Sequence, residues 1–152
     1  MTITLATEAD IPALCSLLEA LFAQEVEFKP DIDAQQRGLK MLIASPQVGA
    51  ILVNRRQGKV VAMVSLLYSV STALGGRVCT LEDMVVAPEY RRLDDGSHIG
   101  TALLTHAIHY AREQGVLRVT LLTDDDNHAA QRFYQRQGFA FSTMQVMRKG
   151  LV

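Results

Sequence analysis

The stretch Thr80–Leu104, which reads TLEDMVVAPEYRRLDDGSHIGTALL, limits most strongly what this chain can fold into. An apolar run that contains Glu82 and Asp83 predicts a buried strand, and Pro88 marks the turn after it. A glycine-containing loop and an apolar helix start follow. A strand that leads through such a loop into a helix can bind an anionic phosphate with its backbone N–H groups. The stretch therefore predicts a phosphorylated ligand held beside acidic side chains.

The rest of the chain predicts a mixed α/β domain. Three- and four-residue apolar spacing predicts helices over 11–22, 34–44, 97–114 and 129–137. Short β-rich runs predict strands over 2–5, 48–54, 59–68, 77–87, 117–122 and 139–147. The expected order is β-α-α-β-β-β-α-β-α-β, with the last strand either whole or broken in two, in a single domain over 1–152. The helix before the 117–122 strand implies a parallel crossover.

Local residues sharpen the prediction for four of these elements. Asp33 is expected to cap the second helix, and Gly115 and Gly138 are expected to end the last two helices. The strand at 117–122 is almost continuously apolar, so burial on both faces is expected.

Composition excludes several classes of function. The 152 residues carry a net charge of −1, which gives no basic stripe for nucleic acid. No apolar run is long enough to span a membrane and no signal peptide is evident, so a cytoplasmic protein is expected. Cys15 and Cys79 are expected to be buried free thiols. The spacing of the four histidines matches no metal site.

The glycine loop has two interpretations from its local spacing alone. Gly96 and Gly100 flank Ser97, His98 and Ile99, and Arg91 and Arg92 lie upstream, where they can pair with phosphates. The same residues also suit an ordinary glycine turn with Ser97 as a helix cap. Local spacing leaves both open.

Three other groups of residues are candidates for chemistry. Alternation along a strand puts Glu82 and Asp83 on opposite faces, and a carboxylate inside an apolar strand suits a general base unless it faces solvent. Tyr134, in the helix NHAAQRFYQRQG, can act as a general acid or can simply pack. The acidic segment 24–31, which includes Glu25 and Phe28, is either a solvated connection or a lid that attracts a cationic substrate.

Together these segments resemble the GNAT superfamily of acetyl-CoA-dependent N-acetyltransferases. Asp95-Gly96-Ser97-His98-Ile99-Gly100 matches the cofactor motif R/Q-x-x-G-x-G/A, and Thr101-Ala102-Leu103-Leu104 looks like the typical helix start after it. The strand VVAPEYR before the loop and the segment NHAAQRFYQRQGF after it are also similar to the family. Two departures are His98 in place of the middle glycine and an apparent insertion over 92–95.

The resemblance implies acetyl-CoA as co-substrate, no metal, and a small cationic amine as acceptor. It implies that Glu82 is the base, on the same face as Met84 and Val86 by parity, and that Tyr134 protonates the leaving thiolate. A further set of residues would line the substrate site: Glu25, Phe28 and Asp83. The residues that would bind the cofactor are Met84, Val85, Val86, Arg91, Arg92, Gly96, Ser97, His98, Ile99, Gly100, Thr101 and Asn127.

Alternative functions remain open at the level of sequence. A protein lysine or N-terminal acetyltransferase would need an open groove for a peptide, and a non-catalytic acyl-CoA sensor would keep the fold without turnover. An ordinary α/β scaffold that binds another nucleotide is a third possibility. Only residues 139–152 follow Gly138, so the last strand is expected to be single or to pair with a second copy, and we expect a homodimer.

Overall fold

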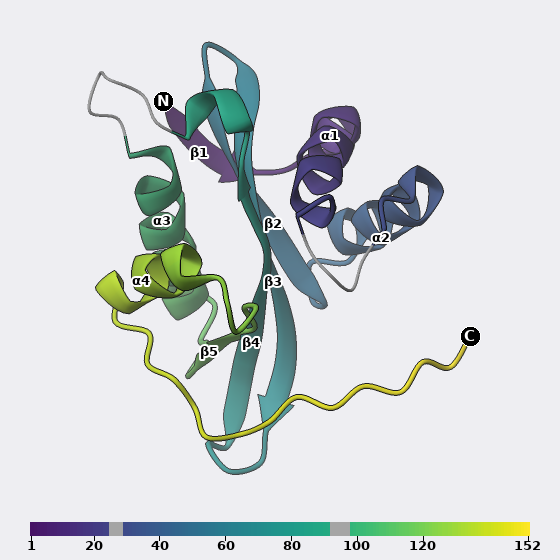
Figure 1. Ribbon diagram of the computed structural model, residues 1–152. Helices are drawn as coiled ribbons and strands as arrows, with labels where there is room; N and C mark the ends of the chain where they lie inside the picture. Colours follow the sequence, from purple (N-terminus) through teal and green to yellow (C-terminus); the bar gives the residue numbers. More distant parts are fainter. Residues whose placement is uncertain (25–28, 92–97) are drawn as a thin grey trace. The chain divides into compact units, whose positions relative to one another are not determined.

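The computed structural model describes residues 1–24, 29–91 and 98–152. The chain forms two compact units, Met1–Leu122 and Thr123–Val152, and each is described by itself. The elements of the first unit are β1 (Thr2–Leu5), the short 3₁₀ helix η1 (Glu8–Asp10), α1 (Ile11–Phe22), α2 (Ile32–Ala44), β2 (Gly49–Arg56), β3 (Lys59–Ser71), β4 (Gly76–Val86), the 3₁₀ helix η2 (Pro88–Tyr90), α3 (Ile99–Glu113) and β5 (Val119–Leu121) (Figure 1).

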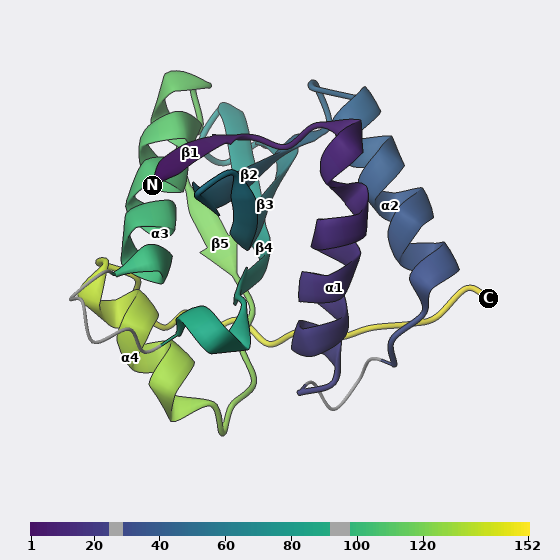
Figure 2. The same cartoon turned by 90° about the horizontal axis from the view of Figure 1, so that it is seen from above.

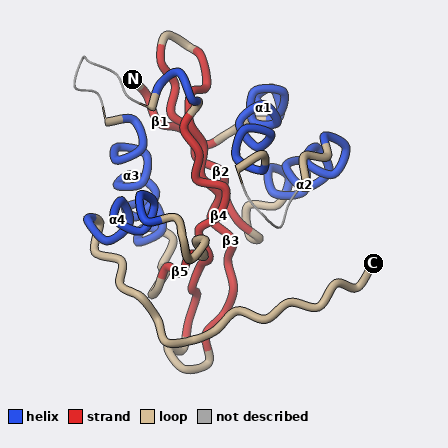
Figure 3. Tube along the Cα trace, viewed as in Figure 1, coloured by secondary structure: helices blue, strands red, loops and turns tan. Residues whose placement is uncertain are grey.

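The first unit is built on a five-stranded sheet in the order β1-β2-β3-β4-β5. The first four strands pair antiparallel, and β5 pairs parallel with β4 because α3 carries the chain back across the sheet (Figure 3). The turn between β2 and β3 places Gln57 at φ 50° and Gly58 at φ 76°. Two consecutive positive φ angles are the pattern of a type I′ hairpin turn, which matches the twist of the strands.

Helices cover both faces of this sheet. Figure 2 shows α1 and α2 on one side of the strands and α3 on the other. The α1 and α2 side is closed by a cluster that includes Leu14, Leu18, Leu39, Ile51, Val53, Met63 and Val85. On α3, Leu103, Leu104 and Ala107 are completely buried. The three- and four-residue spacing of these side chains explains why each segment is helical and which stripe it buries.

An ion pair ties the start of α1 to the sheet. Arg55 Nη1 donates to Asp10 Oδ1 at 2.8 Å, and Nη2 donates to Oδ2 at 2.7 Å. Asp10 Oδ2 also accepts from the backbone N–H of Thr7 at 2.8 Å. These bonds hold the pKa of Asp10 below its usual value, with the hydrogen bond from Arg55 as the main cause.

The second unit contains α4 (His128–Arg136) and an extended tail. Asn127 caps α4, since its side-chain oxygen accepts from Ala130 N at 3.2 Å. Gly138 ends the helix at φ 93°. The ring of Tyr134 makes edge contacts with Phe133 and Phe139, at centroid separations of 5.2 and 5.7 Å.

The predicted element order is confirmed as far as α4, and three local predictions are wrong. The cap of α2 is Asp31, which accepts from Ala34 N at 3.2 Å, so the helix begins at Ile32 and Asp33 lies inside its first turn. The strand predicted over 139–147 is not formed. A strand requires a partner to supply ladder hydrogen bonds, and no pairing involves this segment within the described part of the chain.

The third correction concerns β5. It is only three residues long, and Leu117 and Leu122 beside it are about half exposed rather than buried. Among the strands of the described residues, β5 pairs with β4 alone and so lies at the edge of the sheet, which is why its apolar composition overstated its burial. Over the described residues, no helix combines the length and the hydropathy that crossing a bilayer requires.

Candidate functional site

A β-bulge interrupts β4 at the acidic pair. Ser65 of β3 lies opposite Glu82, and Met63 lies opposite Val85. Between these two pairs, β4 contains one residue more than β3. The bulge places Asp83 at φ 53°, in the left-handed region that few residues other than glycine adopt. Bulges of this kind re-aim side chains and often lie next to active sites.

The bulge overturns the predicted parity of the strand. Residues directly opposite each other in paired strands share a face, and Ser65 lies opposite both Glu82 and Ile51. Ile51 belongs to the cluster under α1 and α2, so Glu82 lies on that face with Val85. Strict alternation predicted that Glu82 shares a face with Val86. The structure shows that it does not.

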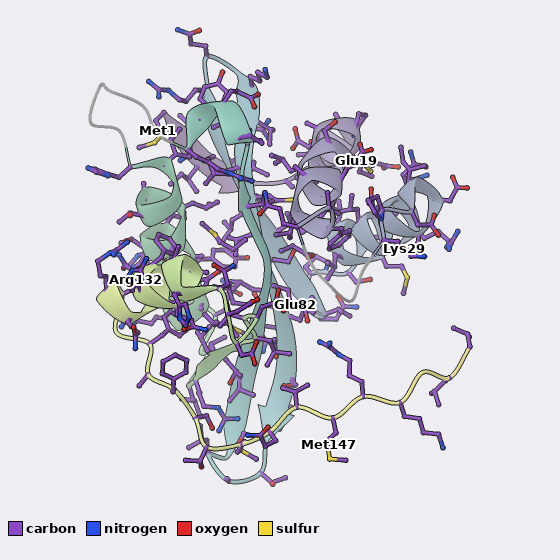
Figure 4. All side chains as sticks on the ribbon, in the orientation of Figure 1. Met1, Glu19, Lys29, Glu82, Arg132 and Met147 are labelled. Carbon is purple, nitrogen blue, oxygen red and sulfur yellow. The ribbon has the colours of Figure 1, made fainter. Side chains whose placement is uncertain are left out.

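The two carboxylates also lie on the same side of the sheet. Asp83 lines a pocket whose other walls come from α1, α2 and the segments beside them. The prediction that Glu82 and Asp83 point to opposite faces is therefore wrong, because the extra residue breaks the two-residue period. Glu82 is exposed to solvent and not enclosed by the strand, and Figure 4 labels it on β4 near the middle of the sheet.

Beyond the bulge, one edge of β4 has no neighbouring strand. β4 and β5 pair only over Cys79–Leu81 of β4, so the five residues Glu82–Val86 extend past the last paired position. Among the described residues, no strand pairs with that side of Met84, Val85 or Val86. A free strand edge can receive an extended amide-containing ligand through backbone hydrogen bonds. Arg91 Nε donates to Val86 O at 2.8 Å and so holds its guanidinium beside this edge.

The start of α3 supplies backbone donors. His98 is the N-cap residue without a side-chain capping bond, and α3 begins at Ile99. The N–H groups of Ile99, Gly100 and Thr101 lie in the first turn, where backbone donors have no intrahelical acceptor. Asn54 Nδ2 donates to the carbonyl of Ile99 at 3.4 Å, which anchors this helix start to β2. Three predicted cofactor residues, Arg92, Gly96 and Ser97, lie outside the described residues.

A pocket of about 470 Å³ lies on the α1 and α2 side of the sheet. Its apolar walls are Leu18, Phe22, Leu39, Met41, Leu42 and Val48. Three charged side chains also line it, namely Lys29, Asp31 and Asp83, and Figure 4 labels Lys29 beside α2. The predicted substrate residues Glu25 and Phe28 lie outside the described residues.

Sequence reasoning missed the part that α2 plays in this pocket. Asp31, Gln35, Gly38 and Met41 recur at three- and four-residue spacing, so they share one helical face. The signal was available as a glutamine, Gln35, at four- and seven-residue spacing from Leu39 and Leu42 on the apolar side of the predicted helix, whereas Gly38 is exposed. Only Asp31 was part of a segment named as a substrate lid.

The remaining predicted residues lie in the second unit. Burial raises the pKa of Tyr134 to about 12, so its phenol is protonated at neutral pH. The side-chain oxygen of Asn127 is used to cap α4, which leaves its amide nitrogen as a donor. In the parts of the chain that the structure describes, no three His, Cys, Asp or Glu side chains gather as a metal site would require.

Comparison with known sequences identifies one family. The sequence model described as "Acetyltransferase (GNAT) family" matches residues 11–139. An aminoalkylphosphonate N-acetyltransferase of Salmonella typhimurium is 29% identical over 134 residues, which cover 88% of this chain and 81% of that protein. A streptothricin acetyltransferase of Streptomyces lavendulae is 38% identical over 73 residues, which cover 48% of this chain and 36% of that protein.

Comparison with solved structures supports the fold. An integron cassette protein from the mobile metagenome of Cole Harbour Salt Marsh has a TM-score of 0.82 and 25% sequence identity. The match covers 99% of this chain and 90% of that protein. The mixed sheet and its helices therefore form an established architecture.

Proposed function

The chain belongs to the GNAT family of acetyltransferases, and from this premise we propose that it transfers the acetyl group of acetyl-CoA to the primary amine of a small cationic molecule. The family makes the protein an acyltransferase. The observation that carries the proposal is the bulge in β4 with an unpaired strand edge beyond it. This edge offers backbone groups to the acyl-pantetheine arm, while the bulge turns two carboxylates toward the α1 and α2 side.

The residues of β4 and α3 fit acetyl-CoA as a co-substrate. The free edge at Met84–Val86 suits the amide groups of the pantetheine arm, which pair as an added strand would. The first-turn N–H groups of Ile99, Gly100 and Thr101 suit a pyrophosphate. Arg91 supplies a positive charge near the strand edge. Asn127, Arg92, Gly96, Ser97 and His98 complete the proposed cofactor set.

The proposed reaction is a direct transfer. The neutral amine attacks the thioester carbonyl carbon, a C–N bond forms and the C–S bond breaks. Glu82 accepts the proton of the incoming ammonium, directly or through water, and a β4 backbone N–H binds the oxyanion. Tyr134 donates its proton to the departing thiolate, a role that its pKa of about 12 supports because the phenol keeps its proton at neutral pH. The attacking nitrogen loses its remaining excess proton to water as the amide forms, and water returns a proton to the Tyr134 phenolate.

The acidic residues near the bulge support a cationic acceptor. Glu82, Asp83 and Asp31 outnumber Lys29 there, so the local charge attracts an ammonium group. Glu25 and Phe28 are proposed to extend the same site. One relative is named for aminoalkylphosphonates, whose phosphonate is anionic. Aminoalkylphosphonates are therefore the substrates against which the cationic-acceptor proposal is best compared.

The test is acetyl-CoA consumption with a panel of amines, followed by two variants. Glu82→Gln and Tyr134→Phe should each lower kcat about 100-fold while the Kd for acetyl-CoA is unchanged. Tyr68→Phe is the matched control, since burial also raises the pKa of Tyr68 to about 12 and it is not placed in the site.

The outcomes separate the alternatives. Normal turnover by Tyr134→Phe would refute the proposal that Tyr134 is the general acid. Acetyl-CoA binding without turnover of any acceptor would indicate a sensor. If aminoalkylphosphonates outperform every diamine, the cationic-acceptor proposal is wrong. Acetylation of peptides in preference to small amines would indicate a protein acetyltransferase.

We also propose a cytoplasmic homodimer. Support comes from the tail, where Phe141, Met144 and Met147 are 69%, 85% and 93% exposed. Large apolar side chains at such exposure often mark an interface. Light scattering after gel filtration should give twice the 16.7 kDa chain mass, and Met144→Asp with Met147→Asp should give a monomer. A wild-type monomer across micromolar concentrations would refute this.

A further inference from the structure

We infer that the pocket between α1 and α2 takes the apolar part of the acceptor, so that the substrate is a primary amine with a hydrocarbon chain or ring. This inference rests on the proposed acetyl transfer and narrows its substrate class. A diamine with a charge at each end, or an amino sugar, would satisfy the charge of the site but would place a charged or polar group against this pocket.

The walls of the pocket are the first observation. Six large apolar side chains from α1, α2 and the residue before β2 face it, and its volume of about 470 Å³ lies in the range of small-molecule sites. Filling such walls with hydrocarbon removes apolar surface from water on both partners. A polar ligand would gain nothing from these contacts.

The second observation is Gly38, which lies in the middle of α2 and borders the pocket. Glycine is the least favourable residue in a helix interior apart from proline. A Cβ added at Gly38 would meet no atom within 4 Å, so packing within the described structure does not require glycine here. A ligand that occupies this space would explain why a larger residue is absent.

The third observation is Gln35, which lines the pocket and is 8% exposed. Its side-chain amide therefore lies at the wall of the pocket. An amide offers both a hydrogen-bond donor and an acceptor to a ligand. Since this amide borders the pocket, a carbonyl or hydroxyl of the ligand can pair with it.

Charge sets the orientation of the ligand. Asp83 lies at the bulge next to Glu82, the proposed base, so an ammonium at that end is close to the proposed acetyl position. Among the described residues that line the pocket, Asp31 and Asp83 against Lys29 leave one net negative charge, which suits a monocation. The hydrocarbon then lies between α1 and α2.

The experiment measures kcat/KM for unbranched primary alkylamines from propylamine to heptylamine, with putrescine and ethanolamine as polar references. We expect a gain of about fourfold for each added methylene until the pocket is filled, because one buried CH₂ contributes about 0.8 kcal/mol. Gly38→Leu fills the pocket and should abolish the gain across the alkyl series. Lys40→Leu adds the same side chain at an exposed α2 position outside the pocket and should keep the gain.

Two outcomes overturn the inference and leave acetyl transfer intact. One is turnover that is flat across the alkyl series, and the other is an equal chain-length gain in Gly38→Leu and wild type. If no amine is acetylated, the proposed function fails. Calorimetry of heptylammonium binding without acetyl-CoA then tests the pocket independently of acetyl transfer. Binding by wild type that Gly38→Leu loses supports the inference, and no binding by wild type refutes it.

Discussion

Replacing Asp10 with alanine should destabilise the first unit more than any surface charge change. Asp10 joins η1 to β2 through two charge-assisted hydrogen bonds from Arg55, at 2.8 and 2.7 Å. The side chains of Arg55 and Asp10 are 22% and 10% exposed, so water replaces these bonds poorly. The same carboxylate accepts from Thr7 N at 2.8 Å as half of a capping box.

The magnitude follows from these contacts. Removing one partner of a buried ion pair costs about 3–5 kcal/mol, because the other charge is left without compensation. Arg55 is partly exposed and can recover some hydration, so we expect the lower end, about 3 kcal/mol in the free energy of unfolding. For a domain of this size, that corresponds to a fall in Tm of about 6–12 °C.

The assay is urea denaturation followed by circular dichroism, with Arg55→Ala and the double variant completing a cycle. Asp126→Ala removes the same charge from an exposed position and should change stability by less than about 0.5 kcal/mol. A loss below about 1 kcal/mol in Asp10→Ala, or a coupling energy near zero in the cycle, would refute the argument.

The same pair predicts a pH dependence. The pKa of Asp10 is lowered in the folded state, so its stabilising contribution is complete above the unfolded value of about 3.9. It is lost as the pH falls through the folded pKa, because the carboxylate must then be protonated. The stability difference between wild type and Asp10→Ala should therefore be constant from pH 5 to 7 and narrow below about pH 4. A difference that widens toward low pH would contradict the assigned sign.

Three further predictions concern packing, backbone and thiols. Leu103→Ala, at a completely buried position on α3, should cost about 3 kcal/mol in urea denaturation, whereas Val70→Ala, at a position that is 79% exposed, should cost less than about 0.5 kcal/mol. Gln57→Asn should stabilise the hairpin by a few tenths of a kcal/mol, because asparagine tolerates the φ of 50° better, and a lower Tm would refute this. Cys15 and Cys79 are buried and burial raises the pKa of both, that of Cys79 to about 11, so a disulfide reagent at pH 8 should label neither thiol before urea is added.

The sequence predicted the element order because each helix and strand of the first unit carries a strong local signal. The apolar spacing of Leu14, Leu17 and Leu18 and the glycines at turns act within a few residues, as they do in any chain. The start of α2 was misplaced by two residues because Asp31 and Asp33 are both competent caps, and only the three-dimensional path of the chain selects the first. The strand after Gly138 failed because a strand depends on a partner that local residues do not specify.

The candidate site was predicted less well than the fold. The carboxylates, the loop before α3 and the strand edge were recognised as chemistry, but the faces of Glu82 and Asp83 were assigned by strict alternation. One extra residue in β4 breaks the alternation of faces. The sequence gives no local sign of this bulge, because Asp83, at φ 53°, is an aspartate and not the glycine that usually marks a positive φ. The pocket was missed because it needs α1, α2 and β4 together, which is tertiary information.

The bulge connects these findings. A regular β4 would separate Glu82 and Asp83 across the sheet, so a single acceptor could meet only one of them. The inserted residue instead turns both toward the α1 and α2 side. This arrangement holds Asp83 at φ 53°, a backbone conformation that is unfavourable for a residue with a Cβ. Asp83→Gly removes the carboxylate and keeps a residue that adopts this φ readily, so we expect a folded protein with a higher KM for cationic amines. Unchanged KM values would show that the strained conformation serves the backbone of the bulge and not the carboxylate.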